Sequence, residues 1–154
     1  MRKLFSIIFL TLIVWGIASC DSHIIFDRYE HTPISGWEKN DTLFFNIPSV
    51  TEAGTYRQEL GLRITGTYPF MSLRLVVEQE IWPNKRIVRD TLDCSLINEK
   101  GTPKGQGISY FQYNMPVNNL TLQEGDSLHI CVKHDMKREI LPGISDIGIK
   151  MTRQ

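Results

Sequence analysis

The sequence lacks an excess of charge of either sign. Its 17 lysines and arginines balance 17 aspartates and glutamates, and the basic residues form no block. A nucleic-acid-binding protein needs clustered cations to neutralise phosphates, and attraction to an anionic lipid surface needs a polybasic patch. We therefore expect no nucleic-acid partner and no membrane attraction that depends on basic side chains.

The chain also lacks the motifs that mark common catalytic sites. It contains no Gly-x-Ser-x-Gly elbow and no His-Glu-x-x-His pair. The glycine-rich stretch 101–107 lacks the Lys-Ser/Thr ending of a phosphate cradle, so we expect a flexible loop there. His129 and Cys131 share one face of a predicted strand, but two ligands do not make a zinc site. The sequence predicts a non-enzymatic protein with no metal and no cofactor.

Cysteine is scarce, with 3 residues in the whole chain. Cys94 and Cys131 lie in apolar, strand-like stretches, and their spacing fits no zinc motif. Buried free thiols are the simpler expectation for this pair. A disulfide between them is permitted in an exported protein and stays an open alternative.

Only one long hydrophobic run occurs, and it stands at the start of the chain. Arg2 and Lys3 precede apolar residues 4–18, which is the layout of a secretory signal. The run is shorter than the roughly 20 residues of a membrane-spanning helix. Residues 17–20, Ile-Ala-Ser-Cys, resemble the bacterial lipobox, which implies cleavage before Cys20, a diacylglycerol on its sulfur and an acylated amine. Palmitate or similar chains would then anchor the protein, whereas an ordinary signal with a chance cysteine is the alternative.

Helical periodicity is nearly absent from the remaining residues. One helical turn is expected at 137–141, closed by Pro142. The turns at 83–85 and 123–126 each predict a hairpin between the strands beside them, and Gly61 indicates a possible bulge. Alternating apolar and polar residues predict strands over 42–47, 56–64, 73–81, 87–97, 108–115, 120–122, 127–133 and 143–151.

These short alternating segments predict an all-β fold. A chain of this size with turns every 8–12 residues is typical of one antiparallel β-sandwich, of jelly-roll or immunoglobulin-like type. We assign residues 1–19 to the cleaved lipoprotein signal peptide and residues 20–36 to a lipid-anchored tether or a first short strand. The sandwich domain is expected over residues 37–154.

Two groups of residues suggest surface chemistry. Trp37 and Trp82 could face a ligand, because exposed rings on a β-sandwich often stack on sugars, although core packing explains such rings more simply. Three Asp-Ser/Thr-Leu triplets resemble the acceptor motif for O-glycosylation of exported proteins in Bacteroidetes. They predict modification of Thr42, Thr91 and Ser127, but a polar turn before a strand also produces such triplets.

Several stretches, taken in order along the chain, form a recognisable set: Trp37 with Asp41–Phe45, Leu62-Arg63, Tyr68–Phe70, Ser72–Leu75, Arg89–Leu92, Gly105–Gly107 and Met136–Ile149. This set resembles the GldH family, the gliding-motility-associated lipoproteins of Bacteroidetes. The resemblance implies an envelope lipoprotein that supports the gliding machinery linked to type IX secretion, with no catalytic residues to carry over. We expect an accessory component with protein partners, held at the periplasmic face of the outer membrane through Cys20. A glycan-binding lipoprotein of a nutrient-uptake system is the alternative.

Overall fold

A computed structural model describes residues 23–154 of the chain. These residues form strands without any helix, so the described part contains no helical segment that could span a bilayer. The strands are β1 (Ile24–His31), β2 (Trp37–Glu38), β3 (Leu43–Ile47), β4 (Gly54–Thr65), β5 (Ser72–Trp82), β6 (Arg86–Ser95), β7 (Tyr110–Leu122), β8 (Ser127–His134), β9 (Ile140–Leu141) and β10 (Ile144–Arg153).

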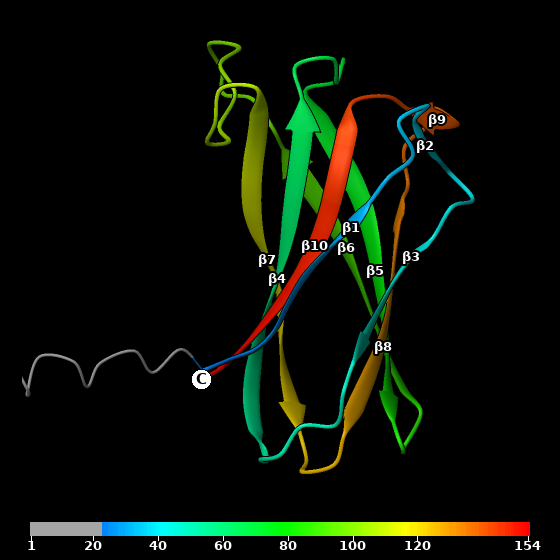
Figure 1. Cartoon of the computed structure of the whole chain (residues 1–154), viewed down its shortest axis with the longest axis vertical. Coiled ribbons are helices and arrows are strands. Elements are labelled where there is room, and N and C mark those ends of the chain that lie inside the picture. The colour runs from blue at the N-terminus through cyan, green and yellow to red at the C-terminus, as the bar shows by residue number, and fades with distance from the viewer. Residues whose placement is uncertain (1–22) are drawn as a thin grey trace, which may run out of the picture.

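The eight longer strands make two four-stranded antiparallel sheets that lie face to face (Figure 1). Sheet one has the order β1-β10-β4-β7 and sheet two the order β3-β8-β5-β6, while β2 and β9 form a small separate ribbon. The expected all-β sandwich is confirmed. The chain passes back and forth between the two four-stranded sheets, and this strand order is that of a jelly roll. The jelly roll is one of the two predicted types.

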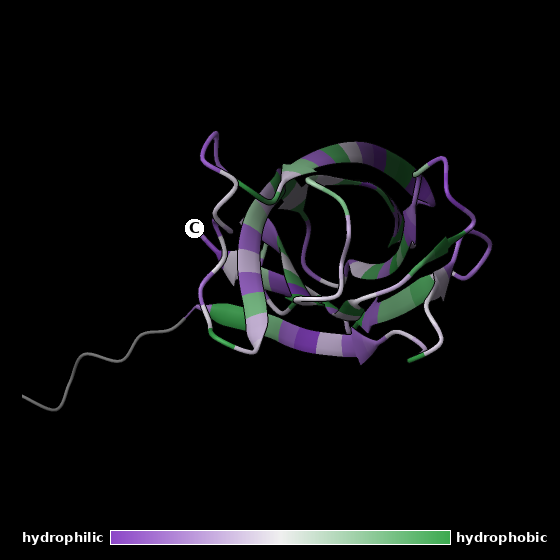
Figure 2. Cartoon of the chain, turned by 90° about the horizontal axis from the view of Figure 1, so that it is seen from above, coloured by the Kyte–Doolittle hydropathy of each residue, from purple (hydrophilic) through white to green (hydrophobic). Residues whose placement is uncertain are grey.

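The core lies between the sheets, because inward positions recur at every second residue. Along β5, Leu73, Leu75, Val77 and Ile81 are each at most 2% exposed. Gln79, which is also buried, shares this inward face, while the even-numbered side chains point outward. Figure 2 shows the same alternation of hydrophobic and hydrophilic bands along the ribbons. Full burial of one such side chain stabilises the fold by about 1.5–3 kcal/mol.

The folded region begins earlier than the expected boundary at Trp37. Residues 24–31, placed within the predicted tether, form β1 and pair with β10 from Ile24 to His31. Phe26 is buried and contributes to the core. Of the two readings for this segment, a strand is what the structure shows from Ile24 onward.

One predicted hairpin is confirmed and the other is wrong. β5 and β6 pair without a register shift around the turn at 83–85. β7 instead pairs with β4 in sheet one, and β8 pairs with β3 and β5 in sheet two. The turn at 123–126 therefore crosses between sheets, and the Asp126 carboxylate fixes it by accepting a 2.8 Å hydrogen bond from the Gln123 N–H.

Two further local expectations are corrected. Residues 137–141 do not form a helical turn, because Ile140 and Leu141 pair with β2 as β9. The glycine-rich loop is held in place rather than free. Its Gln106 exchanges two backbone hydrogen bonds of 2.9 and 3.0 Å with Gln112 of β7.

Candidate functional site

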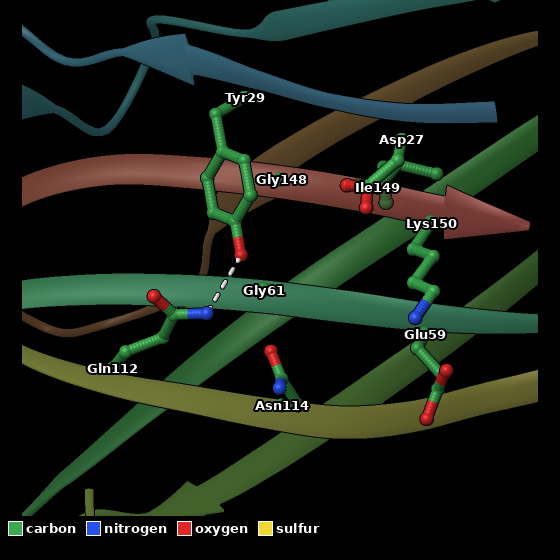
Figure 3. A pocket seen from close by; sticks show the side chains of 9 residues that line it. All are labelled: Asp27, Tyr29, Glu59, Gly61, Gln112, Asn114, Gly148, Ile149 and Lys150. Atoms are coloured by element: carbon green, nitrogen blue, oxygen red, sulfur yellow. Dashed lines mark hydrogen bonds between the residues drawn. The ribbon is translucent and has the colours of Figure 1, made fainter. Parts of the chain in front are cut away.

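The outer face of sheet one carries a tyrosine that lies across two glycines (Figure 3). Gly61 of β4 and Gly148 of β10 are register partners, and Tyr29 of β1 is the next partner of Gly148. A Cβ atom on Gly148 would lie 2.7 Å from the Tyr29 ring, and one on Gly61 would collide with the ring and its hydroxyl. The two glycines therefore create the shallow bed that the ring occupies.

Polar side chains from β4 and β7 hold the Tyr29 ring in place. The Gln112 side chain of β7 donates a 3.3 Å hydrogen bond to the Tyr29 hydroxyl. The Arg63 guanidinium carbon lies 3.9 Å from the ring centroid, a cation–π contact, and Arg63 also donates to Gln112 at 3.3 Å. Burial raises the pKa of Tyr29, and Arg63 opposes that shift. A neutral Tyr29 thus links β1 to all three other strands of sheet one.

The hollow beside this ring is small and polar. Its volume is about 180 Å³, and Asp27, Glu59, Asn114 and Lys150 line it together with the tyrosine and its glycines. Ligand pockets for drug-sized molecules usually span about 300–1,000 Å³. This face is suited to holding β1 and to contacting a polar surface, not to enclosing a substrate.

A second contact fixes the end of β1. The His31 imidazole Nδ1 pairs with the Asp146 carboxylate of β10, which is 4% exposed. Ser145 donates a 2.6 Å hydrogen bond to the other oxygen of that carboxylate, and the Thr32 hydroxyl donates at 2.6 Å to the Ile144 carbonyl. The first strand is therefore tied to β10 beyond its backbone ladder.

Exposed hydrophobic side chains gather in the loops at one end of the sandwich. We call this end, formed by residues 32–36, 66–71, 96–110 and 138–143, the distal loop end, because the strand register places it opposite Ile24 (Figure 1). Exposed apolar surface can mark an interaction site, and five of the nine large hydrophobic side chains that are exposed in the described residues lie at this end. The exposed residues here are Ile34 (105%), Ile108 (95%), Met71 (67%), Tyr110 (55%) and Ile140 (44%).

The predicted pair of ligand-facing tryptophans is not brought together. Trp37 is 0% exposed, donates its indole N–H to the Asp41 carbonyl at 3.0 Å and meets the His134 ring edge-on at 5.3 Å. It is a core residue, so the expectation that it faces a ligand is wrong. Trp82 is half-buried, with the Lys85 ammonium 4.7 Å from its ring centroid. A ligand-facing role of Trp82 stays a prediction, and the glycan-binding alternative loses one of its two tryptophans.

The three candidate glycosylation residues are spread along the outer face of sheet two, with Thr42 and Ser127 toward opposite ends. Thr91 is exposed and pairs with Val76 on that face. Ser127 pairs with Trp82, and Thr42 lines a hollow with Phe44 at the start of β3. Thr42 and Ser127 are half-buried, and their modification stays a prediction. Cys20, the predicted lipidation residue, lies outside the described residues.

The described cysteines are free thiols. Cys94 is buried in the core, and burial raises its thiol pKa to about 12. Cys131 is half-buried on the outer face of sheet two, and its pKa is also raised, mainly by burial. Residues 23–154 contain no cluster of three or more histidine, cysteine or acidic side chains suited to a metal ion.

Comparison with protein families gives the decisive observation. The model of the GldH lipoprotein family matches residues 24–151, nearly the whole described region. The chain belongs to the GldH lipoprotein family. As a lipoprotein of this family it is membrane-anchored and associated with gliding motility. Three residues around Tyr29 and His31, namely Arg63, Asp146 and Gly148, lie in the stretches that carry the family resemblance. No curated protein matches the GldH-family chain described here.

Solved structures resemble the fold at low identity. An aminopeptidase from a Thaumarchaeota archaeon is 12% identical, with 73% of this chain and 24% of that chain covered at a TM-score of 0.39. An uncharacterized Listeria monocytogenes protein is 16% identical, with 86% and 11% covered at 0.39. A family GH115 4-O-methyl-α-glucuronidase, BtGH115A, is 11% identical, with 88% and 18% covered at 0.41. The chain thus spans a quarter or less of these proteins, and at such scores the likenesses bear on neither activity nor substrate.

Proposed function

We propose that this GldH-family chain is a non-enzymatic accessory component of the gliding machinery and the type IX secretion system linked to it. Its signal peptide is cleaved before Cys20, and acyl chains on that residue hold it in the periplasmic leaflet of the outer membrane. The sandwich then acts as a fixed docking body for protein partners. Family membership supports the envelope setting, and the arrangement of β1 supports the docking role.

The observation that carries this proposal is the position of β1, which begins four residues after Cys20 and runs toward the distal loop end. Ile24, where β1 begins, is the fourth residue after Cys20, and an extended chain spans at most about 3.6 Å per residue. The sandwich therefore stays within about 15 Å of its lipid. Tyr29 and His31 lock β1 onto the sheet, so the anchor positions the whole domain rather than a loose arm. The exposed hydrophobic loops then point away from the bilayer.

The proposal is tested by complementing a gene deletion in the native host. Wild-type protein should restore surface secretion and colony spreading. A Met71→Asp/Ile108→Asp double variant should not, because charge at the distal loop end weakens an apolar contact. Ile87→Asp is the matched control, since Ile87 is 63% exposed but lies near the opposite end, beside the turn at 83–85.

Thermal unfolding of each purified variant checks that the sandwich is intact. Normal spreading and secretion in the deletion strain would contradict the proposed function. Full restoration by the double variant would contradict the assignment of the distal loop end as its docking surface.

A further inference from the structure

The two sheets end side by side at β6 and β7, and no backbone ladder joins these strands. We call the junction the seam. Side chains bridge it at three points: Arg86 donates to the Thr121 carbonyl at 2.9 Å, Asn118 to the Asp90 carboxylate at 2.5 Å, and Tyr113 to the Leu96 carbonyl at 2.9 Å. Between the last two bridges the seam is open.

Backbone groups at this opening are unpaired, as the alternation of antiparallel ladders shows. On β7, Gln112 directs both its N–H and its C=O at Gln106, away from β4. Two residues on, Asn114 must direct its N–H and C=O to the same free edge. Its backbone finds no partner among the described residues.

The opposite edge of the seam follows the same rule. The Asp135 N–H bonds to the Arg74 carbonyl at 2.9 Å, so even-numbered residues of β5 face β8 and odd-numbered ones face β6. The odd residues of β5 pair with even residues of β6. Asp93 and Ser95 therefore direct their N–H and C=O groups outward, toward the seam.

A cleft of about 710 Å³ occupies this opening. Cys94, Tyr113 and Met115 form its apolar floor, and the backbones of Asp93, Ser95 and Asn114 stand at its walls. The nearby charged groups both have partners. Asp93 pairs with Arg74 at 2.6 Å, and the Lys104 ammonium donates to the Ser95 hydroxyl at 2.9 Å. The Ser95 hydroxyl is neutral, so Lys104 keeps its positive charge at the rim. The lining suits an occupant with backbone-like hydrogen-bonding groups and an apolar side chain.

The edge strands of the two sheets differ in how well they are protected against pairing with a further strand, and β6 is the least protected. Natural edge strands avoid further pairing by being short or by carrying bulges or proline. β3 has 5 residues and Pro48 follows it, β1 has a register shift near Ile24, and β7 has a register shift and Pro116. β6 pairs regularly over its ten residues without a bulge or proline. Its charged side chains Arg86, Arg89 and Asp93 are held by neighbouring strands. A strand can therefore add to β6 where the cleft exposes it.

We propose that the cleft accepts a short extended segment of a partner protein, which adds as a strand to β6 between the two free edges. Main-chain bonds to Asp93 and Ser95 give the segment its affinity, with Asn114 contributing from the other wall. An uncharged apolar side chain of the segment packs on Met115 and Cys94. This inference rests on the proposed function, because it names how a protein partner is held.

The test places a photo-crosslinking amino acid at Ser95 or Asn114 of the full-length protein in the native envelope. Both positions should crosslink to one and the same segment of a partner, identified by mass spectrometry. Asn119, exposed on β7 between the Asn118 and Thr121 bridges and outside the opening, is the matched control position. A segment that is a second copy of this chain, or different partners for the two positions, would overturn the proposal.

A proline substitution sharpens the same test. Ser95→Pro removes an N–H that faces the seam and not β5, so the β5–β6 ladder is retained, while Ser95→Ala keeps that N–H. Crosslinking from Asn114 should fall at least tenfold in Ser95→Pro and persist in Ser95→Ala. Equal yields in both variants would contradict strand addition.

A measurement that needs no proline variant covers the case in which Ser95→Pro fails to fold. Hydrogen exchange of the Asp93 and Ser95 amides should be slower in the wild-type envelope complex than in the purified protein. Unchanged exchange there would contradict the proposal. Crosslinks from the distal loop end without any from the cleft would refute this inference and leave the proposed function standing.

Discussion

Two absent side chains shape the outer face of sheet one. Gly61 and Gly148 leave room for the Tyr29 ring, and a ring laid over glycine compensates for the packing that glycine lacks in a strand. Glycine in a strand is usually less stable than alanine by about 0.5–1 kcal/mol. Glycine occurs at both positions because the Tyr29 ring occupies the space that a Cβ atom would need.

A double-mutant cycle tests this explanation. Gly61→Ala should destabilise the protein by about 1–3 kcal/mol, because the new Cβ collides with Tyr29. In a Tyr29→Ala background the same change should be neutral or stabilising, which gives a coupling energy of about 1–3 kcal/mol. Urea unfolding measures the four free energies. Equal losses in both backgrounds would show that the ring is not what requires glycine.

His134 gives the fold a dependence on pH. The side chain is 1% exposed, and burial lowers its pKa from 6.5, so the unfolded chain takes up a proton more readily than the folded one. Its contribution to the free energy of unfolding is therefore fully present above about pH 6.5 and is lost as pH falls through the lower folded pKa.

Unfolding of wild type and His134→Gln across the acid range tests this sign. The wild-type free energy of unfolding should fall more steeply below about pH 6.5 than that of the variant. Parallel curves would mean that His134 titrates alike in both states. The absolute loss caused by the substitution does not affect this comparison.

At the scale of the strands, the outer face of sheet two presents the three acceptor triplets. Leu43, Leu92 and Leu128 face the core side of their strands, so each preceding hydroxyl must face outward by alternation. Alternation does not require all three to fall on the same sheet. If Thr42, Thr91 and Ser127 are glycosylated, the outer face of sheet two carries these glycans and the outer face of sheet one carries none of them.

Intact-mass measurement of protein from native cells tests this prediction. Wild type should be heavier than its polypeptide by a glycan mass, and Thr42→Ala/Thr91→Ala/Ser127→Ala should lose that increment. Ser49→Ala, outside any triplet, should keep it. A wild-type mass that matches the lipidated polypeptide alone would remove the glycosylation hypothesis.

Strands with one clear core face were predictable, and those that depend on distant partners were not. Period-two alternation predicts β5, β8 and β10, because most of their inward positions are aliphatic. β6 is predictable as the return strand after the turn at 83–85, although Asp90 is among its inward residues. β1 was missed as a certain strand because Phe26 is its one buried residue and its partner β10 lies more than a hundred residues away. The turn between β7 and β8 has the local sequence of a hairpin. The two strands nevertheless lie in different sheets, because β7 pairs with β4 and β8 pairs with β3 and β5.

The candidate site was less accessible from sequence than the fold. The sequence predicts a possible bulge at Gly61, but the register shift lies at Gln58 and Glu59 instead. Glycine in a strand signals either a bulge or a close approach, and the approaching ring of Tyr29 comes from a segment read as a tether. Gln58 itself breaks the core pattern, since it is 0% exposed and its amide has no partner within the described residues.

At the scale of the whole molecule, the proposed lipid lies at one end of the sandwich and the exposed hydrophobic loops lie at the other. Two or more acyl chains hold a protein stably at a bilayer, whereas a single chain does so only marginally. β1 transmits that anchor to the sheet through Tyr29 and His31. Without the lipid, the same sandwich would be an exported domain with no fixed orientation toward partners.

Incorporation of radiolabelled palmitate into wild-type and Cys20→Ser protein in the native host tests this central claim most directly. The account predicts label in the wild-type chain and in the membrane fraction. It predicts no label in Cys20→Ser, which should also fail to restore spreading in a deletion strain. Label missing from the wild-type chain, or present at equal level in Cys20→Ser, would contradict the anchoring of this protein through Cys20.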